Sequence, residues 1–379
     1  MVQAIVNGKV FDGEQLRSQQ VVLVEGGRIV AVVEEEQLPS GVDELYDLEG
    51  GTLVPGLIDL QVNGGGGALF TATPTVECLR VIGRAHRRTG TTGFMPTLIT
   101  SDFNVMRRAV AAVRQALEER VPGVLGIHLE GPFLNPQRRG VHDASKFCVL
   151  DQAGFELVTS LGSGITLLTL APELAPASMI RRLVAAGVIV SCGHSAATYE
   201  QVCEAMQAGA TGFTHLFNAM TPLQSREPGM VGAALAHEGS WFGIIADGFH
   251  VHPAAFRIAV AARQPGGAVL VTDAMPTVGS PDKSFALDDE TITASGGRVT
   301  NAAGTLAGSD LDMLSAVNNA AAFTGLDWFD ALRMATAYPA RALGLEGELG
   351  AIKPGYRANL LALDSQRRLR ASWIDGVRA

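Results

Sequence analysis

Four side chains of metal-binding and acid–base types occur at the ends of separate apolar segments. Glu130 ends "VLGIHLE", His194 ends "VIVSCGH", His215 lies in "GFTHLFN" and Asp273 lies in "AVLVTDA". A lone histidine in such a place is more often a hydrogen-bonded structural residue. One Glu, two His and one Asp at four segment ends are instead the ligand types of a divalent metal site with a nearby base. The sequence therefore indicates metal-dependent activation of water.

Three further polar residues belong to the stretch "LIDLQVNGGGG", Leu57 to Gly67. Because side chains alternate along a strand, Asp59, Gln61 and Asn63 are expected to share one face, and the apolar residues between them point the other way. The four glycines that follow leave room for a ligand or another backbone segment to approach closely. We expect this face to form one wall of the site.

Eight apolar segments are candidates for the strands that position these residues, and helical segments lie between several of them. The alternation is typical of parallel α/β structure, and in barrels of this kind catalytic residues gather at the carboxyl ends of the strands. A (β/α)8 barrel needs about 250 residues, which Gly51 to Leu343 supplies. We therefore predict the α/β class with a TIM-like (β/α)8 barrel. The segments are "TLVPGLIDLQ", "TGFMPTLIT", "VLGIHLE", "ITLLTLAP", "VIVSCGH", "GFTHLFN", "WFGIIAD" and "AVLVTDA".

Both ends of the chain are rich in predicted β-strands, unlike the middle, where strands and helices alternate. The first fifty residues contain the β-rich runs "AIVNGKVFDG" and "QVVLVEGGRIVAVVE", and the end contains "ANLLALDSQRRLRASWIDGVRA". Paired turn residues interrupt the early runs, as in hairpins. We predict a small β-sandwich domain formed by both termini, residues 1–50 and 345–379, beside a barrel of residues 51–344. The run "FALDDETITASGGRVTNAAGTLAG" is expected to be an antiparallel insertion.

Composition and charge exclude several classes of protein. Hydrophobic residues make up 47% of the 379 and charged residues 18%, which disfavours extensive disorder. The net charge of -9 disfavours nucleic acid as a partner. No uncharged apolar run approaches the ~18 residues of a membrane span, so no membrane partner is expected. Four cysteines without a CxxC pair favour reduced thiols and a cytoplasmic location.

Several short motifs, in this order, resemble the N-acetylglucosamine-6-phosphate deacetylase family of the amidohydrolase superfamily. They are "LVPGLIDLQVNG", "GIHLEGPF", "SCGHSAAT", "THLFNAM", "REPGMVG", "IIADGFHV" and "VTDA". The resemblance is dense from about Thr52 to Asp273 and continues through "GTLAGSDLDM" and "ATAYPARALGL". It implies hydrolysis of N-acetylglucosamine 6-phosphate to glucosamine 6-phosphate and acetate, in amino-sugar catabolism or recycling.

The resemblance also implies roles for the metal-binding residues. Glu130, His194 and His215 would hold one divalent ion per subunit, with zinc favoured and iron, cobalt or manganese also suited to such ligands. Most of the superfamily carries His-x-His where this chain has Gln61 and Asn63, and amides are poor ligands because their nitrogen lone pair is delocalised. A second metal position is therefore expected to be weak or empty. The two amides could either fix the glycine loop or position water.

The remaining implied roles concern proton transfer. Asp273 would accept a proton from water and deliver it to the departing amine. His142, in "RRGVHDAS", would hydrogen-bond the acetyl carbonyl as it becomes an oxyanion.

Substrate contacts follow from the same resemblance. Asn218, the backbone at Ala219, and Arg226 would bind the phosphate, with Arg226 supplied across the interface of a homodimer. His250 would contact a sugar hydroxyl or the phosphate. Leu306, in "TLAGSD", would close over the acetyl group. Arg226 is the only obvious cation among these residues, whereas His86 and His237 are interpreted as solvated surface residues.

Two other functions are compatible with a metal-ligand barrel. One is a different amidohydrolase that acts on a cyclic amide or deaminates a base, such as a dihydroorotase or an adenine deaminase. The other is a non-catalytic scaffold that has lost its metal. Acetate release from N-acetylglucosamine 6-phosphate would separate all three.

Overall fold

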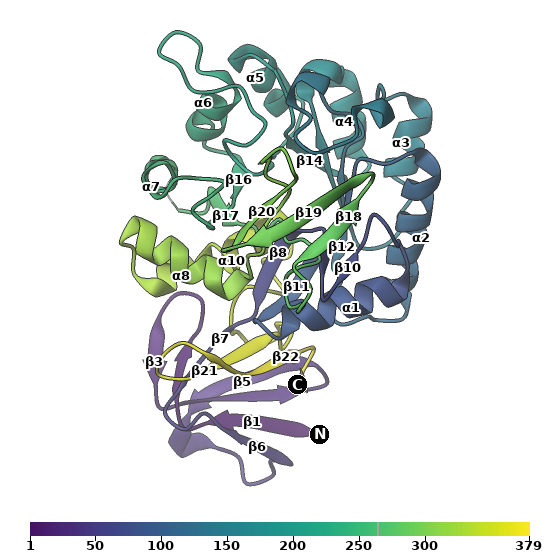
Figure 1. Ribbon diagram of the computed structural model, residues 1–379. Coiled ribbons are helices and arrows are strands. Elements are labelled where there is room, and N and C mark those ends of the chain that lie inside the picture. Colours follow the sequence, from purple (N-terminus) through teal and green to yellow (C-terminus); the bar gives the residue numbers. More distant parts are fainter. Residues whose placement is uncertain (264) are drawn as a thin grey trace.

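The computed structural model describes residues 1–263 and 265–379 and consists of a barrel and a smaller β unit. Figure 1 shows the smaller unit at one end of the molecule, where the first and last segments of the chain meet. Eight parallel strands form the barrel, in the order β17-β16-β15-β14-β13-β12-β11-β8. The predicted TIM-like (β/α)8 barrel is thereby confirmed. The strands are β8 (Leu57–Val62), β11 (Thr91–Ile99), β12 (Gly126–Glu130), β13 (Ile165–Leu170), β14 (Ile189–Cys192), β15 (Gly212–Phe213), β16 (Trp241–Ile244) and β17 (Ala268–Leu270).

Helices surround the barrel because its strands are apolar on both faces. Every residue of β8, β11 and β12 is buried, so solvent must be excluded from the outside of the sheet as well as from its interior. The longer helices α1 and α2 turn an apolar stripe inward and begin at side-chain caps, Thr75 and Asp102. The helices are α1 (Val76–Arg87), α2 (Phe103–Glu118), α3 (Gln152–Val158), α4 (Ala177–Ala185), α5 (Tyr199–Gln207), α6 (Gly229–Ala236), α7 (Pro253–Ala262), α8 (Met313–Thr324), α9 (Trp328–Arg333) and α10 (Ala337–Ala342).

The smaller unit is a sandwich of two sheets built from both ends of the chain. A four-stranded sheet, β5-β4-β1-β6, faces a six-stranded sheet, β23-β22-β21-β7-β2-β3. Residues such as Ile5, Val22, Leu360 and Trp373 pack between them. The strands are β1 (Val2–Val6), β2 (Lys9–Phe11), β3 (Leu16–Ser18), β4 (Gln20–Glu25), β5 (Arg28–Glu34), β6 (Glu44–Asp47), β7 (Thr52–Pro55), β21 (Leu360–Leu363), β22 (Leu369–Ile374) and β23 (Val377–Arg378).

The first expected barrel strand, residues 52–61, is two strands in two different sheets. β7 pairs with β2 and β21 in the sandwich, and β8 pairs with β11 in the barrel. The chain passes between them at Gly56, where a Cβ atom would lie 2.0 Å from the Thr92 hydroxyl oxygen. Glycine is therefore required where the two units join.

The predicted antiparallel insertion is present, and it covers part of the barrel rim. β18 (Ser284–Leu287), β19 (Glu290–Ser295) and β20 (Arg298–Thr300) form a three-stranded sheet. Its apolar residues pack with Ile99 and Met275, which lie at the carboxyl ends of barrel strands. A two-stranded hairpin, β9 (Gly64–Gly65) and β10 (Ala68–Leu69), lies at the same rim. None of the helices in the described residues is both long and apolar enough to span a bilayer.

Candidate active site

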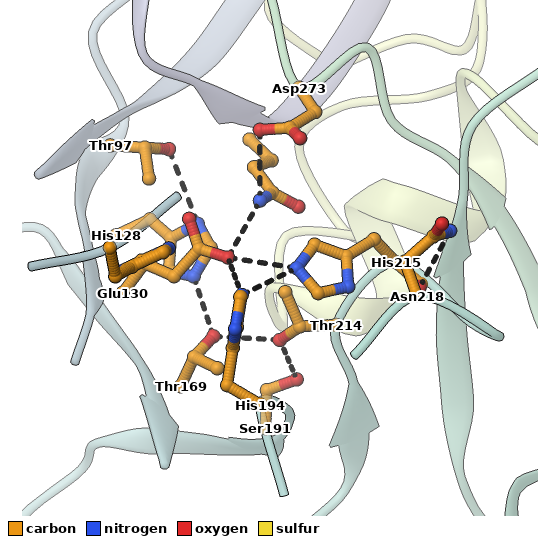
Figure 2. A network of polar contacts seen from close by, with 12 residues as sticks. Thr97, His128, Glu130, Thr169, Ser191, His194, Thr214, His215, Asn218 and Asp273 are labelled. Carbon is orange, nitrogen blue, oxygen red and sulfur yellow. Dashed lines mark hydrogen bonds and ion pairs between the residues drawn. The ribbon is translucent and has the colours of Figure 1, made fainter. Parts of the chain in front are cut away.

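Glu130, His194 and His215 converge at the carboxyl ends of the barrel strands β12, β14 and β15. Their ligand atoms all lie within 4.8 Å of one another, and all three residues are buried. Glu130 Oε1 is 3.3 Å from His194 Nε2 and 3.0 Å from His215 Nε2, and the two imidazole nitrogens are 3.0 Å apart. Figure 2 shows the three side chains pointing at one another. The sequence prediction that these residues form one cluster is correct in its geometry.

The hydrogen-bond pattern around this cluster fits a cation. His194 Nδ1 lies 2.8 Å from the Arg138 carbonyl oxygen and must donate to it, so a neutral His194 presents a lone pair at Nε2. That lone pair faces the Glu130 carboxylate. His215 Nδ1 is buried and has no hydrogen-bond partner among the described residues. No neighbour of Nδ1 therefore opposes the tautomer that presents a lone pair at Nε2. A divalent ion between the three donor atoms would remove the repulsion of facing lone pairs.

The pKa values show how strongly this point attracts positive charge. Burial opposes ionisation of Glu130, yet the contacts with His194 and His215 lower its pKa well below the ordinary range. Burial also opposes a charge on His215, but the contact with Glu130 raises its pKa. Both shifts favour a carboxylate that faces a positive centre.

Asp273 lies beside the cluster and is held by the two amides. Gln61 Nε2 donates to Glu130 Oε1 and to Asp273 Oδ1, each at 3.1 Å, and Asn63 Nδ2 donates to Asp273 Oδ1 at 2.6 Å. Burial, followed by the negative charge of Glu130, raises the pKa of Asp273 to about 6. The amides thus connect the cluster to the neighbouring acid.

The backbone at the rim is unusual at the same residues. His194, His215, Ala219 and Asp273 have φ angles of 48°, 36°, 53° and 53°, in the left-handed region that residues other than glycine adopt rarely. Such conformations concentrate at functional sites, where the surrounding structure must hold them. This conformation also explains why "GFTHLFN" is a strand only at Gly212–Phe213.

A cavity of about 350 Å³ opens beside the cluster. His142 is buried at its wall, with Nδ1 2.9 Å from the Thr100 hydroxyl and its ring centroid 4.4 Å from that of His194. Burial lowers the pKa of His142 to about 3, so the ring is neutral. His250 Nδ1 lies 2.6 Å from Asp247 Oδ2, which fixes the direction of the ring. The residues singled out from the sequence that line the cavity are Asn63, Glu130, His142, His194, His215, Asn218, Ala219, His250, Asp273 and Leu306.

The cations are arranged differently from the expectation. Arg226 lies exposed on the segment before α6 and is not among the residues that line this cavity. Arg298, at the start of β20, lines it instead and is also exposed. The expectation of Arg226 as the only obvious cation is therefore wrong, because the insertion brings a residue far along the sequence to the barrel rim. A glycine turn before Arg298 was the only local signal, and it did not indicate the cavity.

His86 is buried, so its interpretation as a solvated surface residue is also wrong. Its Nε2 lies 2.9 Å from the Gly64 carbonyl oxygen, and a Cβ atom on Gly65 would lie 2.8 Å from the same nitrogen. The glycine run is therefore explained by a close approach of helix α1 to the loop that follows Asn63. His237 is only half-buried, at the end of α6.

A layer of buried polar groups lies beneath the cluster. His128 bridges Thr97 and Thr169 through its two ring nitrogens, at 3.2 and 2.8 Å. The chain of hydroxyls continues from Thr169 to Thr214 and on to Ser191, each step 2.7 Å. Figure 2 shows Thr169, Thr214 and Ser191 below the Glu130 carboxylate in that view. Strands β11 to β15 are thus linked through side chains just below the residues that form the site.

Comparisons with known proteins agree with the fold and the site. The model of the amidohydrolase family matches residues 52–377, and that of the NagA composite domain matches residues 3–53. An N-acetylgalactosamine-6-phosphate deacetylase of Shewanella sp. (strain ANA-3) is 46% identical over 87% of this chain and 84% of its own. An N-acetylglucosamine-6-phosphate deacetylase of Haemophilus influenzae is 34% identical over 99% of both chains.

A solved structure extends the comparison to three dimensions. The N-acetylglucosamine-6-phosphate deacetylase of Pasteurella multocida superposes with a TM-score of 0.96, at 33% identity, over 100% of both chains. The family match covers most of the chain, and relatives above 30% identity are covered nearly end to end. This chain therefore belongs to the amidohydrolase family and, within it, to the N-acetylglucosamine-6-phosphate deacetylase family that its motifs indicate.

Proposed function

We propose that this protein hydrolyses the acetamide of N-acetylglucosamine 6-phosphate, releasing acetate and glucosamine 6-phosphate. The observation that carries the proposal is the buried Glu130, His194 and His215 cluster with Asp273 beside it, at the wall of one cavity. The relative of H. influenzae, which matches 99% of this chain, is named for that reaction.

Glu130, His194 and His215 would hold one divalent ion, for which zinc is the proposed identity. The ion supplies Lewis acidity that activates water and polarises the acetyl carbonyl. Gln61 and Asn63 occupy the position of a second metal pair, and both direct amide hydrogens toward carboxylates. These donations occupy the amide nitrogens, and a neutral amide oxygen is a weaker ligand than imidazole for the metals that a Glu-His-His site takes, so we propose a single metal per chain.

Asp273 is proposed as the proton carrier. Its pKa of about 6 lets it accept a proton from water near neutral pH and return it to the leaving amine. Asn63 and Gln61 both donate to Oδ1 and leave Oδ2 for the proton. His142 would donate from Nε2 to the acetyl oxygen. That role requires the Thr100 hydroxyl to donate to His142 Nδ1, at 2.9 Å, rather than to the Glu130 carbonyl, at 3.3 Å.

Phosphate recognition is assigned to Asn218, the backbone at Ala219, and Arg226 from the partner subunit of a homodimer. Asn218 and Ala219 line the cavity, whereas Arg226 of the same chain does not. A contribution from the partner subunit accounts for both facts. His250 would contact the sugar or its phosphate, and Leu306 would cover the acetyl group. Arg298 is the guanidinium that lies at the same cavity within one chain.

The C4 epimer is a second candidate substrate. The relative of Shewanella, which is 46% identical to this chain, is named for N-acetylgalactosamine 6-phosphate. Its identity is higher than the 34% of the H. influenzae relative. The two sugars differ only at the C4 hydroxyl, and the acetamide and phosphate groups that the proposed residues address are the same. The deacetylation chemistry is therefore common to both candidates.

The test is acetate release by metal-loaded protein from both phosphorylated sugars and from unphosphorylated N-acetylglucosamine. We expect release from a 6-phosphate sugar with a kcat/KM well above that for the unphosphorylated sugar, and loss of activity in Glu130→Gln together with its metal. A cyclic-amide hydrolase, an adenine deaminase or a scaffold predicts no acetate from any of the three. Comparison of the two epimers decides which substrate is preferred.

The cellular setting is proposed from the chemistry of the chain. The four cysteines, Cys78, Cys148, Cys192 and Cys203, are free thiols, which fits the reducing cytoplasm. The product carries a free amine and a phosphate, as an intermediate of amino-sugar catabolism or recycling would.

A further inference from the structure

The first and last strands of the barrel meet differently from all other neighbouring strands. β8 and β17 stand at the two ends of the strand order, and within the described residues no ladder of paired residues joins them. An isolated bridge pairs Val62 with Ala274, and the Asp273 N–H donates to the Gln61 carbonyl at 3.0 Å. We call this junction the seam. The Asn63 and Gly64 N–H groups both donate to the Ala274 carbonyl, beyond the ends of the two strands, and side chains add further contacts closer to the strands.

The Asp59 side chain provides such contacts. Asp59 is fully buried in β8, and its Oδ1 accepts from the backbone N–H groups of Gln61 and Thr272, each at 3.2 Å. Its Oδ2 accepts from the Thr272 hydroxyl. Three donors from the two sides of the seam therefore end on one side chain, which is more than a single backbone carbonyl accepts from a neighbouring strand.

The groups that Asp59 holds lie next to the proposed proton carrier. Thr272 directly precedes Asp273, and Gln61 donates through its side chain to Asp273 Oδ1. On the opposite side, Ser309 Oγ donates to the Thr272 carbonyl, and the Ser309 N–H donates to the Asp273 carbonyl at 2.9 Å. Asp273 itself has the left-handed φ of 53°, which its neighbours must maintain. The direction of its carboxylate thus depends on the seam.

We infer that Asp59 is a positioning residue that aligns Asp273 for proton transfer by closing the barrel between β8 and β17. The inference rests on the proposed function, because Asp273 is its proton carrier. Asp59 touches neither the metal ligands nor the cavity wall. Glu130 ends β12, and His194 and His215 follow β14 and β15, so the strands that carry them are not the strands of the seam; Gln61 Nε2 reaches Glu130 Oε1 at 3.1 Å from the seam side. Loss of Asp59 should therefore disturb proton transfer more than metal or substrate binding.

Asp59→Ala and Asp59→Asn distinguish this role from a general contribution to folding. Asparagine keeps an acceptor oxygen for the two backbone N–H groups, and its amide can donate to the Thr272 hydroxyl. Alanine leaves all three donors unpaired. Because a misplacement of about 1 Å can cost about 100-fold in rate, we expect kcat to fall about 100-fold in Asp59→Ala. Metal content and KM should stay within about threefold, and Asn should restore kcat to within about tenfold of wild type.

Matched variants keep the test decisive. Ser240→Ala removes another buried hydroxyl, which donates to the His237 carbonyl at 2.9 Å and does not line the cavity, and it should leave kcat near wild type. If Asp59→Ala does not fold, Thr272→Val removes the hydroxyl that donates to Asp59 Oδ2 and accepts from the Ala274 N–H, and it should still lower kcat, about tenfold, without changing KM or metal content.

Three results would overturn the inference. One is unchanged kcat in folded, metal-loaded Asp59→Ala or Thr272→Val. Another is a loss of metal that parallels the loss of kcat. The third is an Asp59→Asn variant whose kcat is no higher than that of Asp59→Ala. A wild-type protein that releases no acetate would instead refute the proposed function, so the two failures are distinguishable.

Discussion

Replacing Arg226 with Ala tests how a protein with a net charge of -9 binds a phosphorylated sugar. Arg226 is exposed in the single chain and lies outside the cavity that Asn218 and Ala219 line. If it reaches the phosphate only from a partner subunit, the contact is buried in the dimer. If it serves its own chain, the contact remains in solvent. The size of the loss in kcat/KM therefore shows whether Arg226 contacts the phosphate from the partner subunit or from its own chain.

The two geometries predict different magnitudes. A hydrogen bond to a charged group that is shielded from solvent contributes about 1.5 to 3 kcal/mol, or roughly 10- to 150-fold in kcat/KM. An ion pair in solvent contributes about 0.2 to 1 kcal/mol, which is at most about fivefold. We expect the larger loss for Arg226→Ala. The smaller loss is expected for Arg298→Ala, because Arg298 lies at the open mouth of the cavity and is exposed.

The assay is acetate release with the phosphorylated and unphosphorylated sugars in parallel. Only the phosphorylated sugar should be affected. A mixture of Arg226→Ala and Asp273→Asn chains should regain activity after subunit exchange, since each mixed dimer contains one site with an intact Asp273 and an intact Arg226 from its neighbour. Random exchange restores at most about a quarter of all sites.

Two results would refute this reasoning. Equal losses of kcat/KM on the phosphorylated and unphosphorylated sugars would contradict the assignment of Arg226 to the phosphate. No recovery despite demonstrated exchange would place Arg226 in the site of its own chain.

Three other predictions address the acid, the metal and the seam. Asp273→Asn should keep the metal while turnover falls about 10²- to 10⁴-fold. Turnover near that of wild type in the acetate assay would show that Asp273 is not the proton carrier. Elemental analysis should give one tightly held metal per chain, because amides replace the second imidazole pair; two equivalents that survive brief chelation would contradict this. Burial raises the pKa of Asp59 from 3.8 to about 7, so its contribution to stability is complete below pH 3.8 and is lost as the pH rises through 7. Between about pH 5 and pH 8, wild type should lose roughly 2 to 3 kcal/mol of unfolding free energy relative to Asp59→Asn. Urea unfolding at both pH values measures the difference, and parallel profiles would show that Asp59 is already ionised at pH 5.

The sequence indicated the barrel and the ligand cluster because both depend on local, periodic signals. Buried parallel strands are short apolar runs, and their carboxyl ends meet at one rim. Polar residues at the ends of "VLGIHLE" and "VIVSCGH" therefore had to be neighbours in space, and the structure places Glu130 and His194 in one cluster. Whether Gln61 and Asn63 fix the glycine loop or position water was left open, and their hydrogen bonds to the Glu130 and Asp273 carboxylates form only in the assembled barrel.

Other features depend on contacts that no local pattern contains. His86 lies on an ordinary amphipathic helix, and only the packing of α1 against the glycine loop buries it. Arg298 reaches the cavity because the insertion packs on Ile99, which is far away in the sequence, as well as on the nearby Met275. The seam at Asp59 exists only where the first and last barrel strands meet. In each case the partner residue belongs to a different part of the chain.

The sandwich shared by both termini constrains the order in which the protein is made. β7 is complete after Pro55, but it pairs with β21, which begins at Leu360, about 300 residues later. At a ribosomal rate of about 5 to 20 residues per second, that interval is roughly 15 to 60 s. During it, β7 exposes an unpaired edge of the kind that promotes aggregation. The nascent chain therefore depends on folding of the barrel, or on a chaperone, to protect its first strands until its last ones leave the ribosome.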